Sequence, residues 1–328
     1  MVDFPGVSVI MPVRNEERHL ERAVARVLEQ DYDGDVEVVL AVGPSEDRTW
    51  EVATRIAAGE SHVHVVENPS GATPAGLNIA IAAAMHDILV RVDGHGELSE
   101  GYLATAVRLL QETGAANVGG RMDARGETPF EEAVAAAYNS RLGLGGGGFH
   151  LEDTPAGPAP TVFLGAFRRE ALAAIGGFDE TMHRAQDWEL NYRLRQAGHL
   201  VWFTPELTVL YRPRSSLRAL ARQFWTTGQW RREVARRHPE TVSPRYLAPP
   251  VAVSGLAVGL VAGVLGLVLR NRLLVVGLLA PAVYAAFLLA STATMKGLSP
   301  AARLRLPLVL ATMHVCWGAG FLRGVADR

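Results

Sequence analysis

Four short apolar runs occur in the first hundred residues, and each is rich in the β-branched residues that favour strands. They predict buried strands at residues 7–11, 36–42, 62–66 and 88–92. The stretches between them repeat apolar residues every three or four positions, as amphipathic helices do. This alternation predicts an α/β fold in which a mostly parallel sheet carries helices on both faces.

The expected helix starts follow from residues that cap helices. Asn15, Ser45 and Thr73 are expected N-caps, and Pro74 suits the first position of the third helix. Ser99 is expected to cap a fourth helix. Beyond it, the pattern predicts strands at residues 117–122 and 161–167, and helices at 130–140, at 169–175 and from 186 onward.

The last third of the chain is almost continuously apolar from Leu247 onward. It predicts three transmembrane helices at about 247–269, 273–295 and 306–322, because about 20 apolar residues span about 30 Å of hydrocarbon. The chain would then comprise a soluble domain over 1–211, a connecting segment over 212–246 and a transmembrane region over 247–328. Glycines at 255, 259 and 263 would allow close helix packing within that region.

The connecting segment is strongly basic, with nine arginines and two acids between Arg212 and Arg245. Apolar residues at helical spacing among them predict a basic amphipathic helix in the bilayer interface. An ordinary surface helix is the alternative. By the positive-inside rule, this segment and the 296–305 loop would be cytoplasmic, and three spans would leave the C-terminus outside.

Composition narrows the possible partners and compartments. The formal net charge is −2, so no nucleic acid partner is expected. The only cysteine is Cys316, which excludes an intramolecular disulfide framework and a multi-cysteine zinc cluster. The first twelve residues lack the basic and long apolar regions of a signal peptide, so the soluble domain is expected in the cytoplasm.

Polar segments follow three of the predicted strands, at residues 12–16, 43–47 and 93–97. In open α/β sheets ligands bind outside the carboxyl ends of the strands, so these segments are expected to converge on one crevice. Neither GxGxxG nor GxxxxGK[ST] follows these strands, which disfavours dinucleotide-binding and P-loop proteins.

Asp93, His95 and Glu97 stand at every second position after the fourth predicted strand. In an extended segment their side chains would project the same way and could bind a divalent cation. A polar loop without a metal is the alternative that spacing alone leaves open. Asp187 is similarly ambiguous, because an acid near a helix start is also favoured by the helix dipole.

Residues 142–160 contain four successive glycines, Gly145 to Gly148, and three prolines. A segment of this kind inside a compact domain is either a functional lid or a disordered insertion. We expect a lid, because ordered elements resume directly after it.

Four segments together resemble glycosyltransferase family 2, the inverting enzymes with the GT-A fold, over residues 6–245. They are PVRNE at 12–16, SEDRT at 45–49, DGH at 93–95 and QD at 186–187, in the order and spacing of the family's motifs. The segments LNIAIAAA, VRVDGH, FLGAFRREAL, IGGFDE and QDWELNYRLRQAGH are most similar to membrane-anchored succinoglycan-type glucosyltransferases.

The resemblance implies that Asp93, together with His95, binds Mg²⁺ or Mn²⁺ at the diphosphate of a nucleotide sugar. A cation there would stabilise the charge that collects on the leaving nucleoside diphosphate. Glu97 is a candidate third ligand or a residue behind the ligands. Asp187 is implied to be the general base that removes the proton of the acceptor hydroxyl.

The resemblance also implies a donor site and an acceptor or sugar pocket. The donor site comprises Pro12, Val13, Asn15, Glu16, Asp47, Asn78 and Asp93, and the pocket comprises Gly165, Ala166, Gln186 and Trp188. Many members place an aspartate after the second strand to contact the donor's base, whereas Val42 and Gly43 stand here. Glu16, Asp47 and backbone groups would then recognise the base of UDP-glucose or a similar donor.

We therefore expect a multi-pass protein of the cytoplasmic membrane whose catalytic domain faces the cytoplasm. It would transfer one sugar from the donor to a lipid-linked acceptor in polysaccharide or glycolipid synthesis, in contact with membrane lipids. Residues 222–231 resemble the Q-x-x-R-W motif of processive synthases only loosely, which favours single transfer. A lipid-phosphate sugar synthase, a processive synthase and a catalytically silent membrane scaffold are the alternatives.

Overall fold

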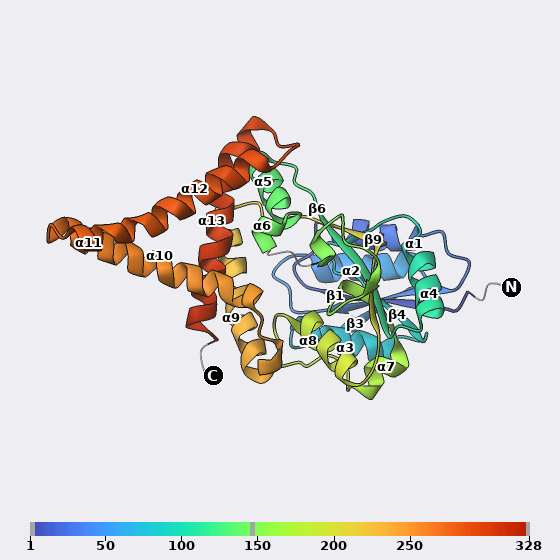
Figure 1. Ribbon diagram of the computed structural model, residues 1–328. Helices are drawn as coiled ribbons and strands as arrows, with labels where there is room; N and C mark the ends of the chain where they lie inside the picture. Colours follow the sequence, from blue (N-terminus) through green and yellow to red (C-terminus); the bar gives the residue numbers. More distant parts are fainter. Residues whose placement is uncertain (1–3, 145–147, 326–328) are drawn as a thin grey trace. The chain divides into compact units, whose positions relative to one another are not determined.

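The computed structural model describes residues 4–144 and 148–325, so residues 145–147 of the expected lid lie outside the described residues. The chain forms two compact units (Figure 1). The first comprises residues 1–123 and 148–211, and the second comprises 124–147 and 212–328. The second unit therefore consists of two separate stretches of the chain. The longer stretch starts at Arg212, as the predicted connecting segment does, and the shorter one comes from the middle of the chain.

The first unit is built around one nine-stranded sheet. Its strands are β1 (Val7–Val13), β2 (Val36–Val42), β3 (Val63–Glu67), β4 (Ile88–Arg91), β5 (Glu97–Leu98), β6 (Asn117–Ala124), β7 (Gly157–Pro158), β8 (Phe163–Arg168) and β9 (Val201–Tyr211). Its helices are α1 (Leu20–Leu28), α2 (Thr49–Gly59), α3 (Thr73–Ala83), α4 (Tyr102–Thr113), the short η1 (Gly148–His150), α7 (Arg169–Ala174) and α8 (Gln186–Gln196).

The strand order is β3-β2-β1-β4-β8-β6-β9-β5, with β7 paired to β9. The first four strands along the chain are parallel, as the alternation predicts; Val7 is level with Val36 on β2 and with Ile88 on β4. The later strands add antiparallel pairs, beginning with β8 against β4. The predicted α/β fold is confirmed, and β4 and β8 lie at the centre of the sheet.

Helices cover both faces of the sheet, because alternate residues of the buried strands face opposite sides. Val9 and Met11 of β1 belong to a core shared with α1, α2 and α4. Ile10 belongs to a second core on the other face, with α3, α7 and α8. This double cover explains why the strands are apolar throughout.

None of the four predicted N-caps is confirmed. The N-cap of α3 is Ala72, so Pro74 is its second residue, and the N-cap of α4 is Gly101 rather than Ser99. α1 begins at Leu20 rather than beside Asn15, and Asn15 has a left-handed backbone with φ 56°. α2 begins at Thr49, and Ser45 does not cap it. The reason is that both side chains bond between loops. The Asn15 backbone N–H donates to Ser45 Oγ (3.0 Å), and Asn15 Oδ1 accepts from the Glu46 backbone N–H (2.8 Å).

Helices are the only regular secondary structure among the described residues of the second unit, apart from Ala124 at the end of β6. Its elements are α5 (Pro129–Tyr138), α6 (Arg141–Leu144), α9 (Leu217–Arg237), η2 (Pro239–Thr241), α10 (Pro244–Val268), α11 (Arg272–Val275), η3 (Val276–Leu278), α12 (Leu279–Thr294) and α13 (Pro300–Arg323). α10 and α12 meet at α11, and α13 follows α12 (Figure 1).

Three helical segments of this unit are long and apolar enough to cross a membrane: Pro244–Val268, Arg272–Thr294 and Pro300–Arg323. They match the three predicted spans closely. Two of the three predicted packing glycines are in close contacts, since a Cβ on Gly259 would lie 2.6 Å from the Gly277 oxygen and one on Gly263 would overlap Leu278. A Cβ on Gly255 would meet nothing within 4 Å.

Candidate active site

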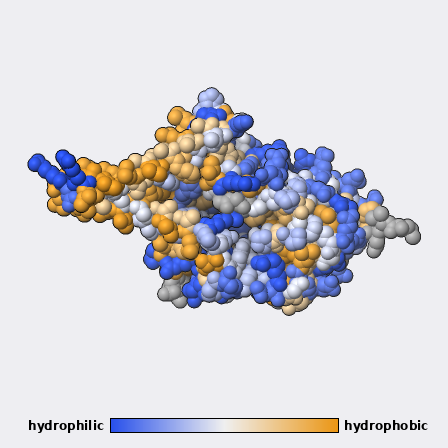
Figure 2. Space-filling view, viewed as in Figure 1, coloured by the Kyte–Doolittle hydropathy of each residue, from blue (hydrophilic) through white to orange (hydrophobic). Residues whose placement is uncertain are grey.

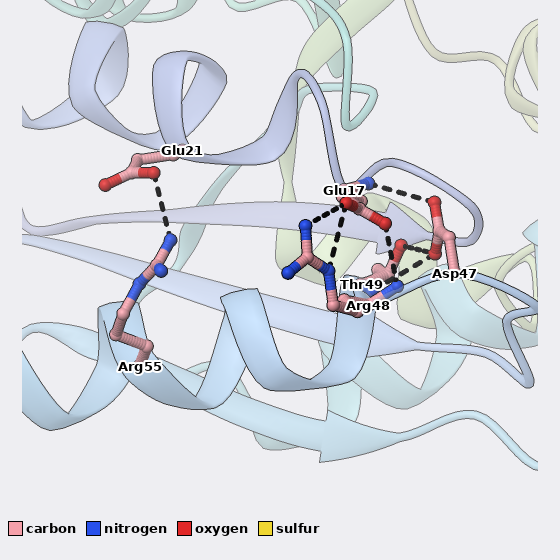
Figure 3. Close-up of polar contacts among 6 residues, drawn as sticks. All are labelled: Glu17, Glu21, Asp47, Arg48, Thr49 and Arg55. Carbon is pink, nitrogen blue, oxygen red and sulfur yellow. Dashed lines mark hydrogen bonds and ion pairs between the residues drawn. The ribbon is translucent and has the colours of Figure 1, made fainter.

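The loops that follow β1 and β2 are joined by hydrogen bonds at the carboxyl edge of the sheet. The Glu16 backbone N–H donates to Thr49 Oγ1 at 2.8 Å, and the Glu17 backbone N–H donates to Asp47 Oδ2 at 3.2 Å. Glu17 also accepts from the Arg48 guanidinium, at 2.7 Å from NH2 (Figure 3). The predicted convergence of these two loops is therefore observed.

Both oxygens of Asp47 are used inside this loop network. Oδ2 accepts from Glu17, while Oδ1 accepts from the backbone N–H (3.1 Å) and the hydroxyl of Thr49 (Figure 3). Burial alone would raise the pKa of Asp47, but these hydrogen bonds outweigh it and lower the pKa. Asp47, a predicted donor-binding residue, therefore stabilises the conformation of this loop.

The third loop contains a turn rather than an extended segment. β4 ends at Arg91, and the Gly96 backbone N–H donates to the Asp93 carbonyl oxygen at 2.7 Å. The turn breaks the alternation that would align Asp93, His95 and Glu97. Glu97 instead lies in β5 and forms an ion pair with Arg22 of α1 at 2.9 Å. The prediction that the three side chains project together is wrong.

His95 is directed toward the first loop. Its Nδ1 shares a hydrogen bond with Glu16 Oε1 at 2.7 Å. Gly94 allows this approach, because a Cβ there would lie 2.9 Å from Cγ of Glu16. The described residues contain no group of three histidine, cysteine, aspartate or glutamate side chains that could hold a metal ion. A cation bound here would therefore need ligands in addition to these side chains, such as substrate phosphates or water.

Asp93 and Asp187 are brought together by Arg91, the last residue of β4. Arg91 donates from Nε (3.2 Å) and NH2 (2.9 Å) to Asp93 Oδ1, and from NH1 to Asp187 Oδ1. The arginine side chain is 3% exposed, whereas those of Asp93 and Asp187 are 29% and 27% exposed. Two predicted functional carboxylates, 94 positions apart in the chain, therefore share one buried guanidinium group.

The pKa values of these two carboxyls shift in opposite directions. Burial would raise the pKa of Asp93, but the positive charges of Arg91, His95 and Arg184 outweigh it and lower that pKa. Burial raises the pKa of Asp187 to about 6, and the nearby Asp93 adds to this, while Arg91 opposes it. At neutral pH both groups are ionised, but Asp187 is the better proton acceptor.

The remaining donor positions of the prediction line the strand ends or support the site. Pro12 and Val13 are the last residues of β1, and the Gly43 backbone N–H donates to the Val13 carbonyl at 2.8 Å. Asn78 on α3 is bonded to the segment before α8. Its side-chain amide donates to the Phe178 carbonyl and accepts from the Phe178 N–H, both at 2.9 Å.

The four pocket positions differ in their surroundings. Gly165 on β8 is level with Arg91, and its φ of 134° favours glycine. Ala166 is fully buried in the core opposite Val90, so its methyl group has no surface for a sugar. Gln186 and Trp188 flank Asp187 at the start of α8. Trp188 stacks on Tyr192 with ring centroids 5.6 Å apart.

Arg91 is a functional residue that was not predicted from the sequence. The feature that could have indicated it is a charged side chain inside the apolar run ILVRV, where the strand is buried on both faces. A buried arginine is costly unless it is paired, so its presence predicts carboxylate partners nearby. One partner, Asp93, is two positions further along the chain, whereas the other, Asp187 at the start of α8, is 96 positions away.

Comparison with known proteins adds three findings. The model of the family "Glycosyl transferase family 2" matches residues 8–176. The succinoglycan biosynthesis protein ExoA of Rhizobium meliloti is 31% identical over 321 residues, covering 97% of this chain and 94% of that protein. The pre-mycofactocin glycosyltransferase of Mycobacterium tuberculosis is 28% identical over 256 residues, covering 74% of this chain and 50% of that protein.

A solved structure supports the fold. The mannosyltransferase PcManGT from Pyrobaculum calidifontis, solved in complex with GDP-Man and Mn²⁺, superposes with a TM-score of 0.62. The match covers 100% of this chain and 89% of that one, at 22% sequence identity. The two chains therefore share a GT-A-like fold.

Proposed function

The chain belongs to glycosyltransferase family 2, and on that premise we propose that it transfers one sugar from a nucleotide-sugar donor to a lipid-linked acceptor, inverting the anomeric carbon. UDP-glucose or a similar compound is the proposed donor, and the product enters polysaccharide or glycolipid synthesis. The relative named for succinoglycan biosynthesis supports this class of pathway. Three helices apolar enough to cross a membrane support an acceptor tethered to lipid.

One observation carries the proposal: Arg91 joins Asp93 and Asp187, two carboxylates with opposite pKa shifts. Pairs of titratable groups whose surroundings move their pKa values apart are typical of acid–base sites. Arg91 uses Oδ1 of each aspartate, and within residues 4–144 and 148–325 neither Oδ2 has a hydrogen-bond partner. One oxygen of each carboxylate is therefore available to substrates.

Asp187 acts as the general base through Oδ2. It takes the proton of the acceptor hydroxyl as that oxygen bonds to the anomeric carbon. The bond from this carbon to the diphosphate breaks at the same time, and its electron pair leaves with the nucleoside diphosphate. Attack opposite the leaving group inverts the centre in one step, so no covalent sugar–enzyme intermediate is required.

Asp93 would be a suitable ligand for Mg²⁺ or Mn²⁺ bound to the diphosphate of the donor. Mg²⁺ in particular is commonly held by one or two carboxylates together with substrate phosphates and water. Asp93 Oδ2 fits that pattern, with His95 as a further candidate, whereas Glu97 is committed to Arg22. When bound, such a cation would neutralise the charge that develops on the diphosphate.

Substrate positions follow from the same loops. The strand ends at Pro12 and Val13, with Asn15, Glu16 and the Asp47 loop, are the proposed donor side, and Asn78 supports it through Phe178. Gln186 and Trp188 beside the base, with Gly165 on β8, are proposed to face the acceptor or the transferred sugar. An aromatic ring suits the apolar face of a sugar.

We further propose that the catalytic unit faces the cytoplasm and that the arginine-rich α9 of the second unit contacts membrane lipids. Exposed arginines attract the anionic headgroups of the cytoplasmic leaflet. They include Arg218 and Arg222 near the start of α9.

Replacement of the base tests the proposal. The Asp187→Asn variant keeps a side chain of the same shape but cannot accept the proton, so transfer is expected to fall by 10²- to 10⁴-fold. The measurement is sugar transfer by purified full-length protein, with release of nucleoside diphosphate as the readout. Chelation by EDTA should abolish transfer, and added Mn²⁺ should restore it. Undiminished transfer by Asp187→Asn would refute the assigned base.

Product analysis separates this proposal from its enzymatic alternatives. Mass spectrometry of the lipid product is expected to reveal one added hexose. Successive hexoses would identify a processive synthase, and a sugar attached directly to lipid phosphate would identify a lipid-phosphate sugar synthase. The pairing of Asp93 and Asp187 with Arg91 argues against a catalytically silent scaffold, which has no need for a buried arginine between two partly exposed carboxylates.

A further inference from the structure

The three apolar helices of the second unit have different surroundings. α10 and α12 contact mainly each other, the turn between them and α13, and their exposed side chains are apolar, such as Val258 (70%) and Leu289 (64%). They form a hydrophobic arm whose tip is polar (Figure 2), and Arg270 to Arg272 occupy the turn between the helices. This is the pattern of a hairpin that crosses the hydrocarbon and returns.

α13 is packed against the arginine-rich α9 and against the segment 124–144. Gly228 of α9 meets the backbone of Trp317, and Gly320 of α13 meets the backbone of Trp225, so the two helices approach closely. At the end of α13, Gln229 donates to the Gly324 carbonyl at 2.9 Å. α13 is also the least apolar of the three candidate spans and the most buried inside the unit.

The segment 124–144 occupies another side of α13. Glu132 of α5 accepts from the backbone N–H and the hydroxyl of Ser299, both at 2.6 Å, at the start of α13. Halfway along, His314 Nε2 bonds to the Leu142 carbonyl oxygen at 2.7 Å. If α13 crossed the bilayer, α5, α6 and α9 would have to enter hydrocarbon with it.

That arrangement is energetically unfavourable. α9 exposes Arg222, Arg232 and Arg236, and a charged side chain near the bilayer centre costs about 2.5–3.5 kcal/mol even on insertion scales. The outer face of α13 is different. Leu304 (81% exposed), Leu308 (54%), Val315 (39%) and Leu322 (47%) recur at intervals of four and seven residues, which aligns them on one side of the helix. Such a stripe suits the boundary between headgroups and acyl chains.

We propose that only α10 and α12 cross the membrane, and that α13 lies in the interface with its stripe of Leu304, Leu308, Val315 and Leu322 in contact with lipid. The chain then crosses twice, so its C-terminus is on the same side as the catalytic unit. This differs from the three spans and external C-terminus that the sequence predicts.

Cysteine labelling tests the number of crossings. Cys316→Ser provides a background without cysteine, to which Asp33→Cys, Arg272→Cys or Arg323→Cys is added singly at an exposed position. Spheroplasts expressing each full-length variant are treated with a membrane-impermeant maleimide before and after lysis. Asp33→Cys reports the catalytic side, and Arg272→Cys reports the turn of the hairpin.

The proposal requires Asp33→Cys and Arg323→Cys to react from one side and Arg272→Cys from the other. Reaction of Arg323→Cys from the side opposite to Asp33→Cys would establish three crossings and overturn it. Reaction of all three variants from one side would overturn it as well, since the hairpin would not cross. Neither result depends on enzymatic activity.

A second inference comes from Arg91 and rests on the proposed function. Its planar guanidinium uses three N–H groups on two carboxylates from different elements, which fixes their separation and orientation. The fork is covered by Phe178, whose ring centroid lies 6.0 Å from Arg91 Cζ. Asn78 in turn holds the Phe178 backbone by donating to its carbonyl and accepting from its N–H.

The geometry assigns Arg91 as a positioning residue that aligns Asp187 with Asp93 and leaves the second oxygen of each aspartate for substrate. Lysine in its place keeps the charge but offers one nitrogen instead of a fork, so it cannot orient both carboxylates. Misplacement of a reacting group by about 1 Å can cost about 10²-fold in rate.

Arg91→Lys is therefore expected to lower kcat about 100-fold, with a small change in the KM of the donor. Arg168→Lys is the matched control, because Arg168 is a β8 arginine that donates to backbone carbonyls, those of Ala115 at 3.1 Å and Leu110 at 2.6 Å. Its kcat should remain within about threefold of the native value. Arg91→Gln is a second variant if lysine impairs folding, judged by thermal melting.

The double variant Arg91→Lys/Asp187→Asn separates positioning from a structural role. If Arg91 acts largely through Asp187, its replacement in the Asp187→Asn background should lower the residual rate by much less than about 100-fold, because only its effect on Asp93 remains. Fully additive losses, or native kcat in a folded Arg91→Lys, would overturn the assignment. Undiminished transfer by Asp187→Asn alone would instead refute the proposed base, so the two failures are distinguishable.

Discussion

At the scale of single residues, one arginine gives two neighbouring aspartates different chemistry. Arg91 outweighs burial at Asp93, whose pKa is lowered, but not at Asp187, whose pKa is raised to about 6. The first carboxyl therefore stays ionised, as a cation ligand must, while the second can take up a proton near physiological pH. This difference yields a direct test.

Activity should depend on pH through Asp187. A raised pKa means that the carboxyl keeps its proton until the pH exceeds about 6, and only the deprotonated form can act as base. We expect kcat/KM for the acceptor, which reports the free enzyme, to be constant above pH 7 and to fall about tenfold per pH unit well below 6. Circular dichroism over the same range controls for unfolding. A flat profile down to pH 5 would contradict this assignment.

Asp47 should matter for stability before it matters for the donor. Its carboxylate accepts three hydrogen bonds within the loop network, so Asp47→Ala is expected to destabilise the protein by about 1–3 kcal/mol. Glu46→Ala is the matched control, because the neighbouring side chain is exposed. Thermal melting measures both. A large rise in donor KM at unchanged melting temperature would favour direct donor binding by Asp47 instead.

At the scale of elements, glycines decide where helices can touch. α9 and α13 approach so closely at Gly228 that an added Cβ would overlap the Trp317 carbonyl. The same stretch of α9 buries Leu220, Phe224 and Val234. The apolar side of the predicted amphipathic helix is thus occupied largely by α13, and Leu217 and Trp225, each 38% exposed, remain for lipid.

Alanine at Gly228 should weaken this contact. We expect Gly228→Ala to lower stability by about 1–3 kcal/mol, because neither backbone can move aside without loss of packing. Gly255→Ala in α10 is the control, since a Cβ there meets nothing within 4 Å and alanine favours helix. Melting in detergent, followed by tryptophan fluorescence, compares them. Equal melting temperatures would indicate that the α9–α13 contact is looser.

The sequence predicts the strands more accurately than the starts of the helices. Strands such as β2 are predicted to the residue, because a run like VEVVLAV is set by local composition. The helix starts at Asn15 and Ser45 are missed because their side chains bond to each other's loops, 30 residues apart. A cap and a cross-loop bond require the same residue types, and only the fold distinguishes them.

At the scale of the whole molecule, the site was predictable in part. Asp93 and Asp187 follow from motif order, and the convergence of strand ends follows from the parallel strands. The turn at Asp93 and the separate pairing of Glu97 depend on β5 and α1, which no local pattern specifies. The roles of the site residues remain predictions until the variants are measured.

The division of the chain into units has a practical consequence for truncation. Cutting before Arg212 would remove α9 to α13 but leave residues 124–147, which belong to the same unit. α5 would then lose the cover that buries Ala133, Val134 and Tyr138, including the edge-to-face contact of Tyr138 with Phe224. Such a fragment would carry a bare apolar helix and tend to aggregate. A soluble version for crystallisation or screening therefore needs a redesigned α5 as well as a new end.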